Sequence, residues 1–130
     1  MYNTEISAKE HVAGIIERAR KAQKIADTYS QEKVDELVGA MAWAIVKDEN
    51  SKPIAKLAFE ESQLGYYDAK YIKLQKKVRG AYRDMKGKKS VGVIEKDEDK
   101  GIIKLAKAVG VIGAITPCTN PEATPVINAM

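Results

Sequence analysis

Cysteine and histidine are almost absent from this chain: its 130 residues include one of each. A single cysteine excludes an internal disulfide, and one cysteine with one histidine excludes an ordinary four-ligand zinc site. The sequence has no run of about 20 apolar residues, the length that a membrane span requires. Residues 1–7 lack the basic segment followed by an apolar one that begins a secretory signal. We therefore expect a cytoplasmic protein with no metal and no membrane partner.

A continuous basic face is also missing. Lysine and arginine together number 22 and the acids 18, which gives a net charge of +4. The basic residues are spread among the acids, and the one local cluster, residues 86–89 (KGKK), has no aromatic side chains within it. Nucleic-acid binding is typical of clustered basic residues accompanied by aromatic ones. The charge pattern therefore predicts no nucleic-acid partner.

Four helices are predicted in the first part of the chain. Ser7 and Glu10 have the spacing of a capping box, and apolar residues at helical intervals follow over residues 8–28. Ser30 is in position to cap a second helix, whose apolar stripe includes Trp43. We expect this stripe to form a packed helix face.

The third and fourth predicted helices are bounded by proline, glycine and aspartate. Pro53 favours a helix start and Gly65 a helix stop, which delimits the third helix. Asp68 is expected to cap the fourth helix, which ends near Gly87.

After residue 89 the pattern changes to strands. Segments 90–95, 101–108 and 109–116 are rich in valine and isoleucine and are separated by charged or glycine-containing turns. The first two are expected to form a hairpin, and the third to be a buried strand. Because a two-stranded ribbon is only marginally stable alone, we expect the hairpin to pair with something outside this segment.

The third predicted strand leads into a corner that forms the candidate site. Asn120, Pro121 and Glu122 have the order of a helix start: a capping residue, proline at the first helical position and an acid in the first turn. Such a junction presents a polar side chain and free backbone N–H groups at a sheet edge, where α/β folds bind ligands. From the residues alone, Asn120 is either a plain helix cap or a ligand-binding group.

Cys118 lies in the same corner and allows two interpretations. A cysteine beside a helix N-terminus can have a lowered pKa and act as a nucleophile. Cysteines are also commonly buried without reacting, and we favour a thiol that is buried or that lies behind the residues contacting the substrate.

Few residues follow the corner in the sequence. Residues 122–130 allow a helix shorter than the roughly 12 residues that are already marginal in isolation. We therefore expect the chain to be the N-terminal part of a longer protein.

The segment at residues 107–121 (KAVGVIGAITPCTNP) resembles the start of the cofactor domain in CoA-acylating aldehyde dehydrogenases, a group within the aldehyde dehydrogenase superfamily. Segments 29–35, 42–45, 60–68 and 89–94 resemble the same family in the same order. Within the family, the chain is most similar to the enzymes that act on sulfoacetaldehyde or succinate semialdehyde.

The resemblance implies an α/β fold of the aldehyde dehydrogenase type. Residues 1–88 would be the helical part of the cofactor domain and residues 89–108 the β-ribbon of the oligomerisation region. Residues 109–130 would be the first strand and helix start of a Rossmann-type nucleotide-binding core, which is incomplete in this chain. A homo-oligomer, either dimer or tetramer, is implied as well.

The resemblance also implies a reaction, in which an aldehyde is oxidised with NAD or NADP and its acyl group is transferred to coenzyme A. Asn120 matches the family position whose amide stabilises the oxyanion. The nicotinamide side of the cofactor site is matched by Ile115, Thr116, Pro117 and Cys118. The nucleophilic cysteine of the family lies beyond residue 130, so the chain alone is expected to be inactive.

Two hypotheses from different classes follow. One is the N-terminal portion of this enzyme, and the other is a non-catalytic helical interaction or assembly module that pairs through its exposed ribbon. The Asn120 corner favours the enzyme, because an interaction module has no need of a ligand-type corner. Residues that hold a sulfonate or carboxylate tail, and those that select NAD or NADP, are expected in later segments.

Overall fold

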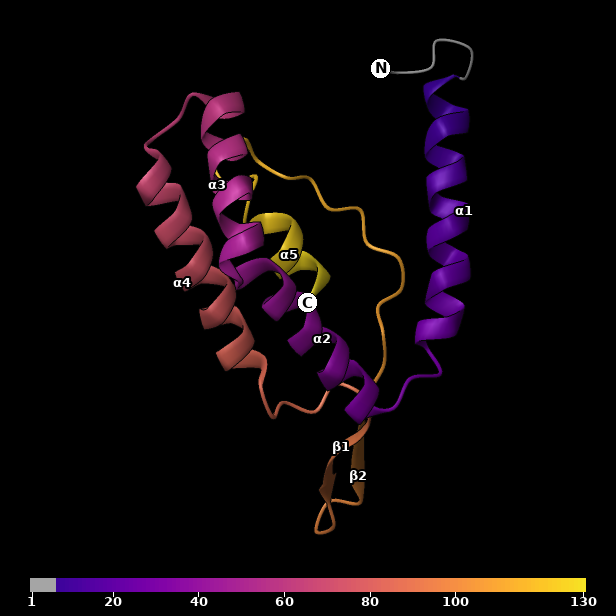
Figure 1. Ribbon diagram of the computed structural model, residues 1–130. Coiled ribbons are helices and arrows are strands. Elements are labelled where there is room, and N and C mark those ends of the chain that lie inside the picture. Colours follow the sequence, from indigo (N-terminus) through magenta and orange to yellow (C-terminus); the bar gives the residue numbers. More distant parts are fainter. Residues whose placement is uncertain (1–6) are drawn as a thin grey trace. The chain divides into compact units, whose positions relative to one another are not determined.

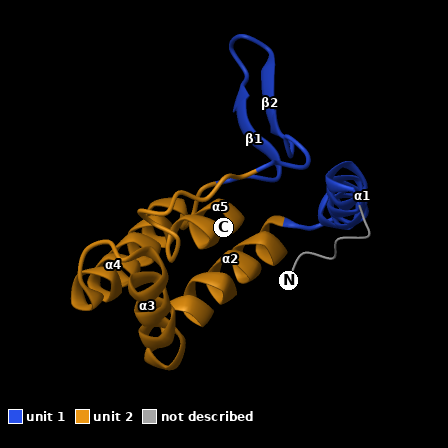
Figure 2. Ribbon diagram, turned by 90° about the horizontal axis from the view of Figure 1, so that it is seen from above, with its two compact units in different colours: residues 1–30, 89–113 blue, residues 31–88, 114–130 orange. Residues whose placement is uncertain are grey.

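The computed structural model describes residues 7–130, which are mostly helical with one small sheet (Figure 1). The elements in chain order are α1 (Ala8–Ala26), α2 (Gln31–Val46), α3 (Asp48–Ser62), α4 (Tyr67–Met85), β1 (Gly92–Asp97), β2 (Ile102–Ala106) and α5 (Thr124–Ala129). The chain divides into two compact units, one of residues 1–30 and 89–113 and the other of residues 31–88 and 114–130 (Figure 2). The domain boundaries derived from the resemblance stay a prediction.

Helix α1 begins with the predicted capping box. The Ser7 hydroxyl oxygen accepts a hydrogen bond from the Glu10 backbone N–H at 3.2 Å, and the Glu10 carboxylate accepts one from the Ser7 backbone N–H at 3.0 Å. Hydrogen bonds from the Ser7 hydroxyl and then from its backbone N–H lower the pKa of Glu10. The helix ends at Ala26 rather than at the predicted residue 28, and none of its residues is buried.

Strands β1 and β2 form an antiparallel ribbon, which confirms the predicted hairpin. The register shifts between Val93 and Glu95, where a bulge interrupts the ladder. Lys104 on β2 forms an ion pair with Glu95 on β1, with the Nζ and Oε2 atoms 2.7 Å apart. Most residues of both strands are exposed, so the ribbon carries no hydrophobic core of its own.

The third predicted strand does not form. Residues 107–117 have no regular secondary structure, and the side chains of Val109 and Ile115 are 87% and 94% exposed. A strand needs a neighbour to pair with its backbone N–H and C=O groups, and the only sheet within residues 7–130 consists of β1 and β2. The apolar run indicated a buried strand, but the described residues supply neither a partner strand nor a covering layer.

The hydrophobic core lies in the unit that contains α2 to α5. Helix α4 contributes Leu74 and Val78, whose side chains are completely buried. They pack with Ala42 and Val46 of α2 and with Ala123, the residue just before α5. The core therefore packs Ala123 against α2 and α4. This contact fixes the position of the candidate corner, which lies directly before α5.

Helix α3 starts and ends earlier in the chain than predicted. The helix starts at Asp48 and contains Pro53 in its interior, instead of starting at Pro53. Asp48 and Glu49 lie in the first turn, where acidic side chains interact favourably with the helix dipole. At the other end the helix stops at Ser62, before the predicted Gly65, and both Gln63 and Gly65 have positive φ, of 53° and 73°.

Helix α4 also starts before the predicted position. Tyr66 is the N-cap residue and makes no side-chain capping bond, while Asp68 lies within the first turn. The prediction that Asp68 caps this helix is therefore wrong, although its charge still complements the helix dipole. The helix ends at Met85, close to Gly87, as predicted. Helix α2 starts at Gln31, directly after Ser30, which is the predicted cap position.

Candidate functional site

The corner before α5 is a series of turns rather than a helix start. The Asn120 backbone N–H donates to the Pro117 carbonyl oxygen at 3.3 Å, and the Asn120 carbonyl accepts a hydrogen bond from the Thr124 N–H at 3.2 Å. Helix α5 starts at Thr124, and Ala123 occupies the N-cap position without a side-chain hydrogen bond. The prediction that Asn120 caps the terminal helix is therefore wrong.

The next acidic residue, Glu122, is engaged with another helix instead of with the start of α5. The Glu122 side chain is committed to ion pairs with α4 and is fully buried there. In the described part of the chain the Asn120 amide consequently does not cap α5, and the residue is half-buried.

Two lysines of α4 hold the corner in place. The Nζ atoms of Lys70 and Lys73 both donate to the Thr119 carbonyl oxygen, at 3.2 and 3.0 Å. The Lys73 Nζ lies 3.0 Å from one oxygen of Glu122, and the Lys70 Nζ lies 3.9 Å from the other. Neither carboxylate oxygen receives a hydrogen bond of good geometry, so the attraction is ionic. We call these four residues the lysine clasp.

The lysine clasp is buried to different degrees. The Glu122 side chain is 0% exposed, Lys70 is 4% exposed and Lys73 is 31% exposed. Burying charges is costly unless opposite charges lie close by, and a buried pair is strongly destabilised when one partner is removed. The clasp therefore fixes the backbone directly before Asn120 to the middle of α4.

The other predicted site residues precede Asn120 on an open stretch of chain. Ile115, Thr116, Pro117 and Cys118 are all exposed. The prediction that Cys118 is a buried thiol is wrong, because no element within the described residues covers it. Contact of these four residues with a nicotinamide ring stays a prediction, and their exposure leaves the segment accessible to one.

The clasp residues were not identified from the sequence. The sequence predicts Glu122 in the first turn of a helix, and it gives no role to the two lysines. The signal that was available is the spacing of Lys70 and Lys73, which are three residues apart and therefore lie on one face of α4. Their common partner, 46 or more residues further along the chain, has no local signature.

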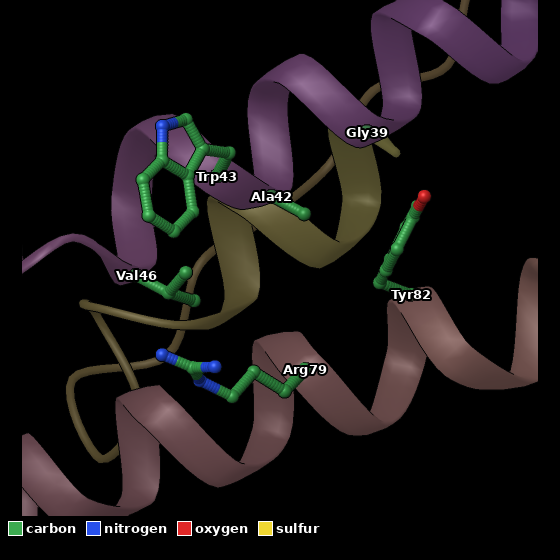
Figure 3. A pocket seen from close by; sticks show the side chains of 6 residues that line it. All are labelled: Gly39, Ala42, Trp43, Val46, Arg79 and Tyr82. Carbon is green, nitrogen blue, oxygen red and sulfur yellow. The ribbon is translucent and has the colours of Figure 1, made fainter.

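A concave feature lies between α2 and α4. It is a groove of about 490 Å³ lined by Gly39, Ala42, Trp43, Val46, Arg79 and Tyr82 (Figure 3). A side chain at Gly39 would meet the Tyr82 hydroxyl at 3.4 Å, so glycine gives the tyrosine ring its space. Trp43 is 64% exposed at this groove, which contradicts the predicted packed helix face.

The described residues contain neither a candidate metal site nor a candidate membrane span. Within residues 7–130 no three histidine, cysteine, aspartate or glutamate side chains are grouped as a metal site would require. No helix in this range is long and apolar enough to cross a bilayer.

Comparison with curated proteins yields several relatives, although no family model matches the chain. The acylating sulfoacetaldehyde dehydrogenase of Bilophila wadsworthia is 50% identical over 109 residues, which are 84% of this chain and 24% of that protein. The acetylating succinate-semialdehyde dehydrogenase of Clostridium kluyveri is 40% identical over 128 residues, which are 98% of this chain and 27% of that protein. The chain matches an N-terminal portion of acylating aldehyde dehydrogenases.

A solved structure agrees with this match. An acetylating aldehyde dehydrogenase from Geobacillus thermoglucosidasius matches with a TM-score of 0.87 and 33% identity, over 92% of this chain and 26% of that one. The predicted aldehyde dehydrogenase-like fold class is thereby confirmed. The chain spans about a quarter of the length of these acylating aldehyde dehydrogenases.

Proposed function

We propose that this chain forms part of an acylating aldehyde dehydrogenase that converts sulfoacetaldehyde or succinate semialdehyde, with coenzyme A and NAD or NADP, into the acyl-CoA. The observation that carries the proposal is the match at 40% to 50% identity over 84% to 98% of the chain. The names of those relatives supply the two candidate aldehydes.

Asn120 has the central role within these residues. Addition of a cysteine thiolate to the aldehyde carbon moves an electron pair onto the carbonyl oxygen, and an amide N–H aimed at that oxygen stabilises the charge. The Asn120 side-chain nitrogen carries two N–H donors, and it is these that the oxyanion role requires. The lysine clasp limits the movement of the backbone that carries it. Such positioning matters because a fixed donor needs no reorganisation during the reaction.

The segment before Asn120 would face the cofactor. When bound, NAD or NADP accepts a hydride and coenzyme A supplies the thiol that takes the acyl group. Ile115 is 94% exposed and residues 116–118 are exposed, so an apolar side chain is accessible there to the face of a nicotinamide ring. No sequence or structural feature within residues 7–130 distinguishes NAD from NADP.

The alternative of an assembly module has one observation in its favour. The ribbon exposes large apolar side chains on both strands: Val93, Ile94, Ile102, Ile103 and Leu105. An exposed ribbon with free edges can add a strand from a partner. This alternative predicts association without aldehyde turnover, whereas the enzyme predicts both.

The test begins with the coding sequence past codon 130 and then uses the protein made from the whole reading frame. We expect formation of NADH or NADPH from either aldehyde to require coenzyme A, and we expect the acyl-CoA to appear in equal amount. Cys118→Ser should retain measurable acyl-CoA formation, because the family resemblance places the nucleophile elsewhere. Absence of coenzyme A-dependent turnover would reject the proposal, and complete loss in Cys118→Ser would move the nucleophile to Cys118.

A further inference from the structure

The turn that carries Asn120 is attached to α4 on both of its sides. Before Asn120, the Thr119 carbonyl oxygen accepts hydrogen bonds from the Lys70 and Lys73 Nζ atoms at 3.2 and 3.0 Å. After it, the Glu122 carboxylate lies 3.9 and 3.0 Å from the same two atoms. All of these residues belong to the unit that contains α2 to α5 (Figure 2). Asn120 therefore lies between two attachments to one helix.

The backbone of Asn120 is also held by the turn itself. Its N–H donates to the Pro117 carbonyl oxygen at 3.3 Å, and its carbonyl oxygen accepts a hydrogen bond from the Thr124 N–H at 3.2 Å. With both backbone polar groups engaged, the remaining freedom of the residue lies in its side-chain torsions. The contacts that fix the turn on α4 therefore set the position from which the Asn120 side chain extends.

The ionic part of the clasp is a poor device for stability. The Glu122 side chain is 0% exposed, and neither of its carboxylate oxygens has a hydrogen bond of good geometry. Burying charges costs free energy, and replacing a buried ion pair with apolar side chains is often neutral or stabilising. The packing of Ala123 with Leu74 and Val78 already holds this part of the chain in the core. Apolar packing is non-directional, whereas the hydrogen bonds from α4 select one position of the Thr119 carbonyl.

Lys73 has the closer contacts of the two lysines. Its Nζ lies 3.0 Å from both the Thr119 oxygen and a Glu122 oxygen, whereas the Lys70 Nζ is 3.9 Å from the carboxylate. We propose that Lys73 is a positioning residue for the reaction, which holds the turn so that the Asn120 amide is aimed at the oxyanion. The proposal rests on the proposed function and extends it to a residue of α4. Misplacement of an active-site group by about 1 Å can lower a rate about a hundredfold.

Removal of Lys73 alone should leave the fold intact. Its side chain is 31% exposed, so loss of the ammonium opens no fully buried cavity. Lys70 stays beside Glu122, and the two remain a balanced pair of one cation and one anion. Lys73→Met also keeps the length of the side chain. Lys77→Met, at an exposed position of the same helix, is the matched control for the loss of one positive charge.

The first test measures kcat for acyl-CoA formation in the protein from the whole reading frame. We expect Lys73→Met to lower kcat and kcat/KM for the aldehyde equally, about tenfold or more, because the oxyanion forms only on the way to the transition state. The KM and the melting temperature should change little, and Lys77→Met should retain the wild-type kcat. A wild-type kcat in Lys73→Met would overturn the proposal. A raised KM with an unchanged kcat would also overturn it, because Lys73 would then act in substrate binding.

A double-mutant cycle shows whether Lys73 acts through Asn120. We expect Lys73→Met to lower kcat about tenfold in the wild-type background and less than about twofold in the Asn120→Ala background, where no amide is left to position. Equal losses in both backgrounds, which a misfolded variant would also give, would assign Lys73 to the fold and overturn the proposal.

A measurement that needs no turnover separates this proposal from the proposed function. Hydrogen exchange at the backbone N–H groups of Asn120 and Thr124, followed by mass spectrometry, reports opening of the turn. We expect faster exchange in Lys73→Met than in the wild type or in Lys77→Met. Unchanged exchange would overturn the attachment of the turn by Lys73, even in an active enzyme. Faster exchange in Lys73→Met together with a wild type that forms no acyl-CoA would reject the proposed function and leave Lys73 as the residue that holds the turn.

Discussion

Glu122 shows how far the setting of a residue can differ from its place in the sequence. It follows Asn120 and Pro121 in an order typical of a helix start, yet its carboxylate is buried between two lysines of another helix. The helix starts after it, at Thr124. A buried carboxylate without a cation close by would be costly, and the two lysines supply that cation.

The pKa of the Asp48 carboxyl depends on two neighbouring side chains, which can be removed one at a time. The Lys52 ammonium and then the Tyr71 hydroxyl, which donates to Asp48 Oδ1 at 2.7 Å, lower the pKa of this carboxyl below 3.8. A depressed pKa stabilises the fold above the unfolded value, and the effect is lost as the pH falls through the folded value. We expect Tyr71→Phe to raise the pKa of Asp48, and Lys52→Met to raise it more, in an NMR titration of the carboxyl carbon.

The titration has its own control. Asp97, whose pKa is lowered by Lys100 on the ribbon, should titrate identically in all three proteins. An unchanged pKa of Asp48 in both variants would mean that these contacts do not persist in solution.

Helix α4 organises its unit at the scale of elements. Lys70, Leu74 and Val78 lie at intervals of four residues and are all buried, so one stripe of the helix carries both the clasp and the core. The stripe meets α2 on one part of its length and the chain around Ala123 on another. Packing along this stripe therefore determines where the corner lies, and a cavity in it would loosen both.

Leu74→Ala tests this role of α4. Removal of a completely buried leucine side chain should lower the free energy of unfolding by about 2 to 5 kcal/mol, measured by urea denaturation with circular dichroism. Ile72→Ala, on the same helix but 49% exposed, should cost much less. Equal costs for the two variants would show that the side chain of Leu74 is not in a packed core.

At the scale of the whole molecule, the features that depend on neighbouring residues were predicted best. The capping box of Ser7 and Glu10, the four helices and the β1–β2 hairpin follow from local spacing and are present. Predictions that depended on distant partners were wrong: a strand at residues 109–116, a packed Trp43 and a buried Cys118. Each needs a covering or pairing segment that the described residues do not supply.

The candidate site also contains residues that the sequence indicated and residues that it did not. The oxyanion role of Asn120 comes from a family resemblance, and the local geometry predicted for it was wrong, because the helix starts three residues later than predicted. The lysine clasp joins α4 to a turn far along the chain, so no local pattern indicates it. Apolar side chains on α1, among them Val12 and Ile25, are exposed, although their spacing is that of a core-facing stripe.

The role of Asn120 as an oxyanion donor is tested by the turnover of Asn120→Ala in the protein from the whole reading frame. If its amide stabilises the oxyanion, kcat for acyl-CoA formation should fall about a hundredfold, with an equal fall in kcat/KM and an unchanged melting temperature. Asn128→Ala makes the same substitution at an exposed position of α5 and should leave kcat at the wild-type value. A kcat of Asn120→Ala close to that of the wild type would contradict the claim.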